Sequence, residues 1–162
     1  MKHLYVRDIM TSKVVTLPRR ASSSEAAHTL TSHRVSGAPV IDQDRVVGIA
    51  SKTDLLYARV CASVDNSVTV GDVMTSLIFA VRPGDPAMLA VRLMVEEGIH
   101  HVVVIDEGHK LAGIVSLMDV LRALARGACF QDDPDEALDH AERAAPARAV
   151  QYVDLRETQI HG

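Results

Sequence analysis

A serine and an aspartate recur at the same spacing in two parts of this 162-residue chain. Residues 48–56 read GIASKTDLL and residues 113–121 read GIVSLMDVL, so both copies share the pattern Gly-Ile-x-Ser-x-x-Asp. In front of an apolar helix, Ser-x-x-Asp has the form of a capping box, in which side chains satisfy the first backbone N–H groups. The same hydroxyl and carboxylate could also bind a small ligand.

Three features favour a ligand. The Gly-Ile pair brings a strand to a helix N-terminus beside a small residue, so a ligand can approach the amides and the dipole that hold phosphate groups. Ser51 and Ser116 are followed three residues later by Asp54 and Asp119, and a short carboxylate can accept from both hydroxyls of a ribose diol. Duplication offers this chemistry twice. For a single such tetrapeptide, capping alone would be the better explanation, and that explanation stays open.

Both motifs belong to a longer internal repeat. Residues 6–12 align with residues 70–76 at an offset of 64, and the offset becomes 65 at the motif, where residue 48 meets residue 113. The extra residue falls within 107–110, where a hairpin turn would absorb it. The predicted organisation is repeat 1 at 6–60, a linker at 61–69, repeat 2 at 70–126 and a C-terminal extension of unknown role at 127–162.

Each repeat is expected to run strand, helix, strand, strand, helix. The first helix of repeat 1 is expected to start at the capping box Ser22-x-x-Glu25. The first helix of repeat 2 is expected to start at Asp85-Pro86, with Asp85 as the cap and Pro86 in the first turn, and to end at Gly98. The final helices begin at the repeated serines. The predicted strands are 14–17, 38–41 and 46–50, then 78–81, 102–105 and 111–115; the extension could add a helix at 137–145 and a strand or arm at 150–155. A unit of about 55 residues buries little surface alone, so we expect an α/β (α+β) fold with the repeats packed as a pseudo-twofold pair.

Composition and charge argue against several functions. The net charge of −4 and the lack of a long Lys/Arg run disfavour binding to nucleic acid or to an anionic membrane. No segment approaches the roughly 20 apolar residues of a membrane span, and the start of the chain lacks an apolar signal core, so we expect a cytoplasmic protein without membrane insertion. Cys61 and Cys129 are too few for a disulfide framework or a tetrahedral metal site.

The histidines suggest other chemistry. His100 and His101 could bind a metal together with His109, but adjacent residues of a strand point to opposite faces, and no third ligand has suitable spacing. No Walker loop or Gly-x-Gly-x-x-Gly is present, and no histidine has an evident partner that would activate Ser51 or Ser116 as a nucleophile. We therefore expect no metal, no catalytic residue and no required cofactor.

The order, spacing and duplication of these motifs resemble the tandem CBS domain, or Bateman module, whose repeats carry Gly-h-x-Ser/Thr-x-x-Asp with h apolar. The resemblance covers residues 6–126. The second repeat is similar to the last repeat of the γ regulatory subunit of AMP-activated protein kinase, where valine-histidine-arginine precedes the strand. His100 matches that histidine, whereas His101 departs from the arginine, so the two sites are expected to be unequal.

The resemblance implies two interleaved half-sheets and two ligand crevices between the repeats. In such crevices the aspartate holds the ribose, the serine approaches the phosphate, His100 faces the phosphate and apolar backbone cradles adenine. One crevice would combine Ile114, Ser116 and Asp119 with Val35, Ser36 and Gly37, and the other would combine Ile49, Ser51 and Asp54 with Ile99, His100 and His101. The resemblance also places residues 10–12 and 74–76 near the adenine.

The function implied is a non-catalytic regulatory sensor, with an adenosine-containing ligand such as AMP, ADP, ATP, NAD or S-adenosylmethionine as the regulatory signal. Bateman modules usually pair through their helices, so a homodimer is expected, acting on a target protein that the sequence does not name. Two alternatives stay open. The chain could be a ligand-free dimerisation scaffold in which both Ser-x-x-Asp motifs are only caps, or a nucleotide-processing enzyme with an unrecognised site.

Overall fold

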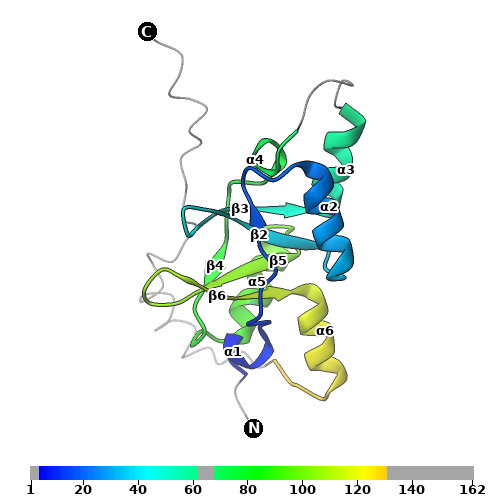
Figure 1. Ribbon diagram of the computed structural model, residues 1–162. Coiled ribbons are helices and arrows are strands. Elements are labelled where there is room, and N and C mark those ends of the chain that lie inside the picture. Colours follow the sequence, from blue (N-terminus) through cyan, green and yellow to red (C-terminus); the bar gives the residue numbers. More distant parts are fainter. Residues whose placement is uncertain (1–3, 62–67, 131–162) are drawn as a thin grey trace. The chain divides into compact units, whose positions relative to one another are not determined.

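The computed structural model describes residues 4–61 and 68–130, in which the elements follow the predicted order in both repeats (Figure 1). The expected helix at 137–145 and arm at 150–155 lie outside the described residues. In chain order the elements are α1 (Val6–Ile9), β1 (Leu17–Pro18), α2 (Ser23–Ser32), β2 (Gly37–Asp42), β3 (Arg45–Ser51), α3 (Lys52–Cys61), α4 (Val70–Val73), β4 (Ala80–Val81), α5 (Ala87–Glu96), β5 (His101–Ile105), β6 (Leu111–Ser116) and α6 (Leu117–Ala125).

The strands form two sheets of three, in the orders β1-β2-β3 and β4-β5-β6. In each sheet the first pair is parallel and the second pair is an antiparallel hairpin. The predicted α/β fold and both hairpins are confirmed. The strands predicted over 14–17 and 78–81 are wrong in extent, because only Leu17 and Pro18, and then Ala80 and Val81, pair with their neighbours.

The described residues divide into two compact units that do not coincide with the two repeats. Residues 4–15 belong with residues 79–130, and residues 16–61 belong with residues 68–78. Backbone hydrogen bonds show how this happens. Thr11 and Ile114 exchange N–H···O bonds of 2.9 and 3.0 Å, and Ile49 and Thr75 exchange bonds of 3.0 and 2.9 Å. The first segment of each repeat is thus part of the unit built around the sheet of the other repeat.

The single-turn helices α1 and α4 were not expected from the sequence, since four residues carry no helical periodicity. Each one buries its first valine, Val6 or Val70, completely. An aspartate at the third position of each helix accepts a hydrogen bond from the backbone N–H of the residue just before the helix. Tyr5 N–H donates to Asp8 and Thr69 N–H donates to Asp72, both at 2.9 Å. These turns fix the segments that cross from one repeat to the sheet of the other.

Local signals placed the longer helices well. Ser22 and Glu25 form the predicted capping box, with bonds of 3.2 and 2.9 Å between side chain and backbone, and Gly98 follows α5 with a φ of +63°. The capping role predicted for Asp85 is wrong. Its carboxylate accepts from the Arg82 N–H of the preceding turn, and Pro86 stands at the start of α5 without a side-chain cap.

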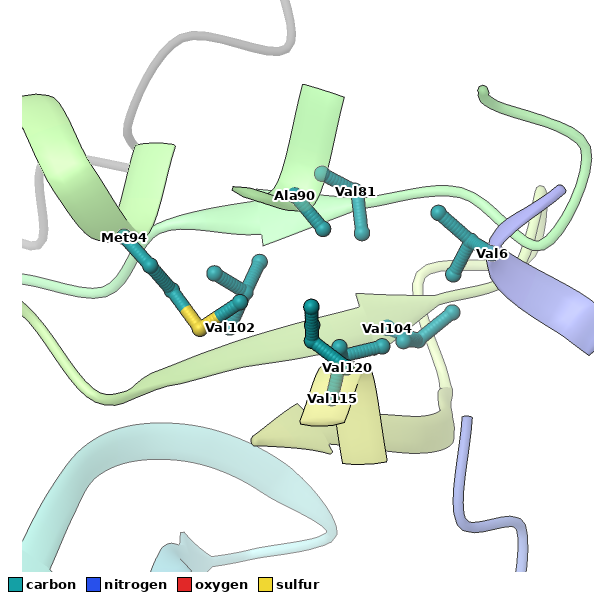
Figure 2. Packing of buried hydrophobic residues seen from close by; sticks show 8 residues of the cluster. All are labelled: Val6, Val81, Ala90, Met94, Val102, Val104, Val115 and Val120. Atoms are coloured by element: carbon teal, nitrogen blue, oxygen red, sulfur yellow. The ribbon is translucent and has the colours of Figure 1, made fainter. Parts of the chain in front are cut away.

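A compact set of apolar side chains lies between the sheet β4-β5-β6 and the helices of its unit (Figure 2). Its members are Val6, Val81, Ala90, Met94, Val102, Val104, Val115 and Val120. Each member has a buried counterpart in the other unit at the offset of the repeat: Val70, Leu17, Ala26, Leu30, Ala38, Val40, Ala50 and Leu55. The duplication therefore extends to the core. Among residues 4–61 and 68–130, every helix falls short of the length and apolarity needed to cross a membrane.

Candidate ligand-binding residues

Each unit carries one serine–aspartate pair where its antiparallel hairpin ends and its last helix begins. In the first unit Ser51 N and Oγ donate to Asp54 Oδ2 at 2.8 and 2.6 Å, and Asp54 N donates back to Ser51 Oγ at 3.3 Å. In the second, Ser116 N and Oγ donate to Asp119 Oδ2 at 2.9 and 2.6 Å, and Asp119 N donates to Ser116 Oγ at 3.3 Å. The capping interpretation is therefore correct for both motifs.

Capping uses one carboxylate oxygen and leaves the other. Both capping donors go to Oδ2, so capping uses none of the acceptor capacity of Oδ1 in Asp54 or in Asp119, which is the capacity that a ribose diol requires. The serines are more constrained. Because a carboxylate has no proton to give, the hydroxyls of Ser51 and Ser116 supply the proton in the 2.6 Å contacts. While capping holds, neither hydroxyl can donate to a phosphate.

The residues that precede β2 and β5 lie directly beside these motifs. The first amide of α3, Lys52 N–H, donates to Ser36 O at 2.9 Å, and the first amide of α6, Leu117 N–H, donates to His100 O at 3.2 Å. Across the hairpins, Gly37 pairs with Ser51. His101 pairs with Ser116 in the same way. The structure thus brings together predicted site residues of the same repeat.

Two groups result, one in each unit. They are Val35, Ser36 and Gly37 with Ile49, Ser51 and Asp54, and Ile99, His100 and His101 with Ile114, Ser116 and Asp119. The pairing of these groups across the repeats, which the family resemblance implies, stays a prediction.

The motif glycines have a packing role that the sequence did not reveal. A Cβ built on Gly113 would lie 2.8 Å from Met10 Sδ and 3.1 Å from Thr11 O. On Gly48 it would lie 2.6 Å from Met74 Sδ and 2.9 Å from Thr75 O. The glycines therefore make room for the methionine-threonine segment of the other repeat. The expectation that they let a ligand approach stays a prediction.

Sequence reasoning missed one charged neighbour of the second motif. Arg122 Nη1 donates to Asp119 Oδ1 at 3.2 Å, and Thr11 Oγ1 makes a longer contact of 3.5 Å with the same oxygen. The signal was present, because residues three apart share a helix face and their side chains lean toward the N-terminus. The equivalent position in the first repeat holds Tyr57, which has no charge.

The histidines differ in their surroundings. His100 is exposed, whereas His101 is half-buried. Burial lowers the pKa of His101 below its usual value, the neighbouring His100 acts in the same direction, and the carboxylate of Asp119 opposes both. The neutral form of His101 is therefore favoured, which distinguishes it from the permanently charged arginine of the related pattern. Within the described ranges, no three His, Cys, Asp or Glu residues are grouped so as to hold a metal ion.

The family model named "CBS domain" matches residues 6–60 and residues 70–126, which is most of the chain. The chain belongs to the CBS domain family. Its two matches make it a pair of CBS domains, and the serine–aspartate motif lies near the end of each.

Two curated relatives show how far this likeness extends. A 17.7 kDa protein of Acidianus ambivalens is 33% identical over 120 residues, which are 74% of this chain and 72% of that protein. Protein MJ1225 of Methanocaldococcus jannaschii is 29% identical over 126 residues, or 77% of this chain. The match spans 44% of MJ1225, so this chain corresponds to less than half of that relative.

Solved CBS structures resemble the chain over most of its length. The CBS domain pair of protein MJ0100, in complex with 5′-methylthioadenosine and S-adenosyl-L-methionine, has a TM-score of 0.71 at 25% identity and covers 78% of this chain and all (100%) of that one. CBSX2 in complex with AMP has a TM-score of 0.65 at 31% identity, over 75% of this chain and 96% of that one. The CBS domain of a bacterial CNNM/CorC family Mg2+ transporter in complex with ATP has a TM-score of 0.65 at 26% identity, over 75% and 87%.

Proposed function

We propose that this CBS domain protein is a non-catalytic regulatory module that binds adenosine-containing ligands through Asp54 and Asp119. The observation that carries the proposal is that the two oxygens of each carboxylate have different roles. Oδ2 caps a helix, while Oδ1 takes no part in capping, so the hydroxyls of a ribose can be accepted at Oδ1 of Asp54, and at Oδ1 of Asp119 in competition with Arg122. Similar CBS structures support it, since they were solved in complex with AMP, with ATP, or with 5′-methylthioadenosine and S-adenosyl-L-methionine.

The proposed ligands share an adenosine and differ in the group attached to it. AMP, ADP, ATP, NAD and S-adenosylmethionine all offer the ribose hydroxyls that a carboxylate can accept from. We place the adenosine in crevices between the repeats, lined by the residues before β2 and β5. Since the serine hydroxyls give their protons to Asp54 and Asp119, phosphate groups would depend on other donors, among which the exposed His100 is suitably placed beside α6.

Ligand occupancy would act by selecting one of two arrangements of the protein. Several large apolar side chains on the last helix of each repeat are exposed and suit a homodimer in the cytoplasm: Leu56, Tyr57, Leu117, Met118, Leu121 and Leu124. Sedimentation of Leu121→Lys should yield a smaller species than the unchanged protein. Val95→Lys on α5, where the side chain is 74% exposed, should sediment as the unchanged protein does.

A ligand-free scaffold is the second candidate, because helix capping alone accounts for the hydrogen bonds of both serine–aspartate pairs. Calorimetric titration with adenosine, AMP, ADP, ATP, NAD and S-adenosylmethionine separates the two. We expect saturable binding of at least one of them, and no heat and no thermal shift at millimolar concentrations would establish the scaffold instead.

The sharpest variants are Asp54→Asn and Asp119→Asn. The amide oxygen can still cap the helix, but an NH2 group replaces the second acceptor and faces the ribose hydroxyls as a donor. Each variant should lose one site, with affinity there falling by about tenfold or more. Unchanged titrations in both would remove the aspartates from the proposal.

A further inference from the structure

The guanidinium of Arg122 occupies the carboxylate oxygen that the proposed function assigns to a ribose. Arg122 Nη1 lies 3.2 Å from Asp119 Oδ1, the oxygen that capping leaves open. The aspartate side chain is only 10% exposed, whereas the arginine side chain is 62% exposed. Arg122 follows Asp119 by one helical turn and leans back toward the N-terminus of α6. It therefore covers the outer side of a nearly buried carboxylate.

The first unit lacks this arrangement. The residue equivalent to Arg122 is Tyr57, which is 72% exposed and uncharged. Among described residues, the hydrogen bonds of Asp54 involve its Oδ2 atom and its backbone, and none is formed by Oδ1. The two carboxylates are thus held by the same capping bonds, yet only Asp119 carries a cation on its second oxygen.

This difference has a consequence for the charge of the ligand. An ion pair with so exposed an arginine is weak, so a ribose can share or displace it. An uncharged nucleoside would gain the ribose contacts but disturb the ion pair without replacing it. A ligand that also carries a phosphate offers the guanidinium a second anion, to which two N–H groups can donate side by side.

We propose that Arg122 is a specificity-determining residue, which makes the Asp119 site prefer adenosine ligands that carry a phosphate over uncharged ones. The Asp54 site, with Tyr57 in that place, has no such preference from this position. The inference rests on the proposed function, because it presupposes that Asp119 binds the ribose. It concerns the ratio of the affinity for AMP to the affinity for adenosine. The predicted change in this ratio can prove wrong even though both ligands bind.

The experiment reads the Asp119 site alone, in an Asp54→Asn background. AMP and adenosine are titrated into this protein with and without Arg122→Gln. We expect the ratio of AMP affinity to adenosine affinity to fall by about three- to tenfold when Arg122 is replaced. The matched control is Arg126→Gln, which removes the same charge from the end of the same helix without contacting Asp119 and should keep the ratio.

A gain of preference tests the same inference from the other side. In an Asp119→Asn background, Tyr57→Arg should raise the affinity for AMP relative to adenosine at the Asp54 site. If Arg122→Gln tightens both ligands equally, or changes the ratio no more than Arg126→Gln does, Arg122 is only a partner of Asp119 and the inference is overturned while the proposed function stands. If the unchanged protein binds neither AMP nor adenosine, the inference is overturned, and the proposed function falls with it only if ADP, ATP, NAD and S-adenosylmethionine also fail to bind.

Discussion

The hydroxyl of Ser116 donates to Asp119 Oδ2 at 2.6 Å, and the backbone N–H of Asp119 donates back to that hydroxyl at 3.3 Å. The pair caps the start of α6 through the chain's own groups. Stability and binding should therefore respond differently to substitutions of its two members.

Ser116→Ala should lower the free energy of unfolding by about 0.5–2 kcal/mol, because the first turn of α6 loses its side-chain acceptor. Asp119→Asn should cost less stability, since its amide oxygen can still accept from Ser116 N–H. Urea unfolding of both variants measures the difference. Ser24→Ala, an exposed change within α2, should stay within about 0.5 kcal/mol. A larger loss for the asparagine than for the alanine would contradict these capping roles.

Gly113→Ala should destabilise the protein by about 1–3 kcal/mol, because its Cβ would meet Met10 Sδ at 2.8 Å and the carbonyl of Thr11 at 3.1 Å. Thermal unfolding provides the measurement. Gly84→Ala is the control, since a Cβ there meets nothing within 4 Å. Shortening the neighbour by Met10→Ala should restore part of the loss in Gly113→Ala, as only the backbone contact then remains. An alanine tolerated at Gly113 as well as at Gly84 would argue against the close approach.

Val6→Ala should loosen the sheet of the second repeat, although Val6 stands at the start of the first. Val6 is fully buried in the cluster that contains residues of β4, β5 and β6. We expect a loss of about 1–3 kcal/mol and faster amide hydrogen exchange in β5 and β6. Val70→Ala is the matched variant and should act on β2 and β3 instead. Exchange that accelerates mainly in β2 and β3 of Val6→Ala would show that the segments are not exchanged.

Acidification should lower the stability of the folded protein, in part through His101. Its pKa is lowered in the folded protein by burial and by His100, against the attraction of Asp119. The unfolded chain, with a pKa near the usual value of about 6.5, then binds more protons than the folded protein, so the free energy of unfolding falls as pH drops below about 6.5. His101→Gln should reduce this fall between about pH 7 and pH 5. Melting temperatures at both pH values should show a smaller change for His101→Gln than for the control His28→Gln on α2, and equal changes would contradict the prediction.

Much of the fold was predictable because its signals are local. Both hairpins follow from runs of valine and isoleucine interrupted by turns, and α2 follows from Ser22 and Glu25. The turns α1 and α4 were not predictable in this way. They are held by bonds to residues far along the chain, such as Val6 N–H to Asp85 O, and no local pattern encodes such a partner.

The candidate site was likewise predictable where its signals are local and not where its contacts come from distant parts of the chain. Ser51, Asp54, Ser116 and Asp119 were recognisable from their spacing, and their capping bonds are those that the spacing predicts. The packing role of the motif glycine was not predicted, because the methionine that needs its space comes from the other repeat. Arg122 was missed although it lies on the same helix, since an arginine at an exposed position has many possible partners.

The exchange of first segments also bears on how such a chain could have arisen. In a single copy of the repeat, the sheet would have lacked the threonine that pairs with its edge. The first segment of that copy would have carried a valine that has no place in the core of its own repeat. Two separate copies could have met these needs by exchanging their first segments, as molecules do in a domain-swapped dimer. When the two copies are joined in one chain, this exchange of segments becomes intramolecular and no longer depends on protein concentration.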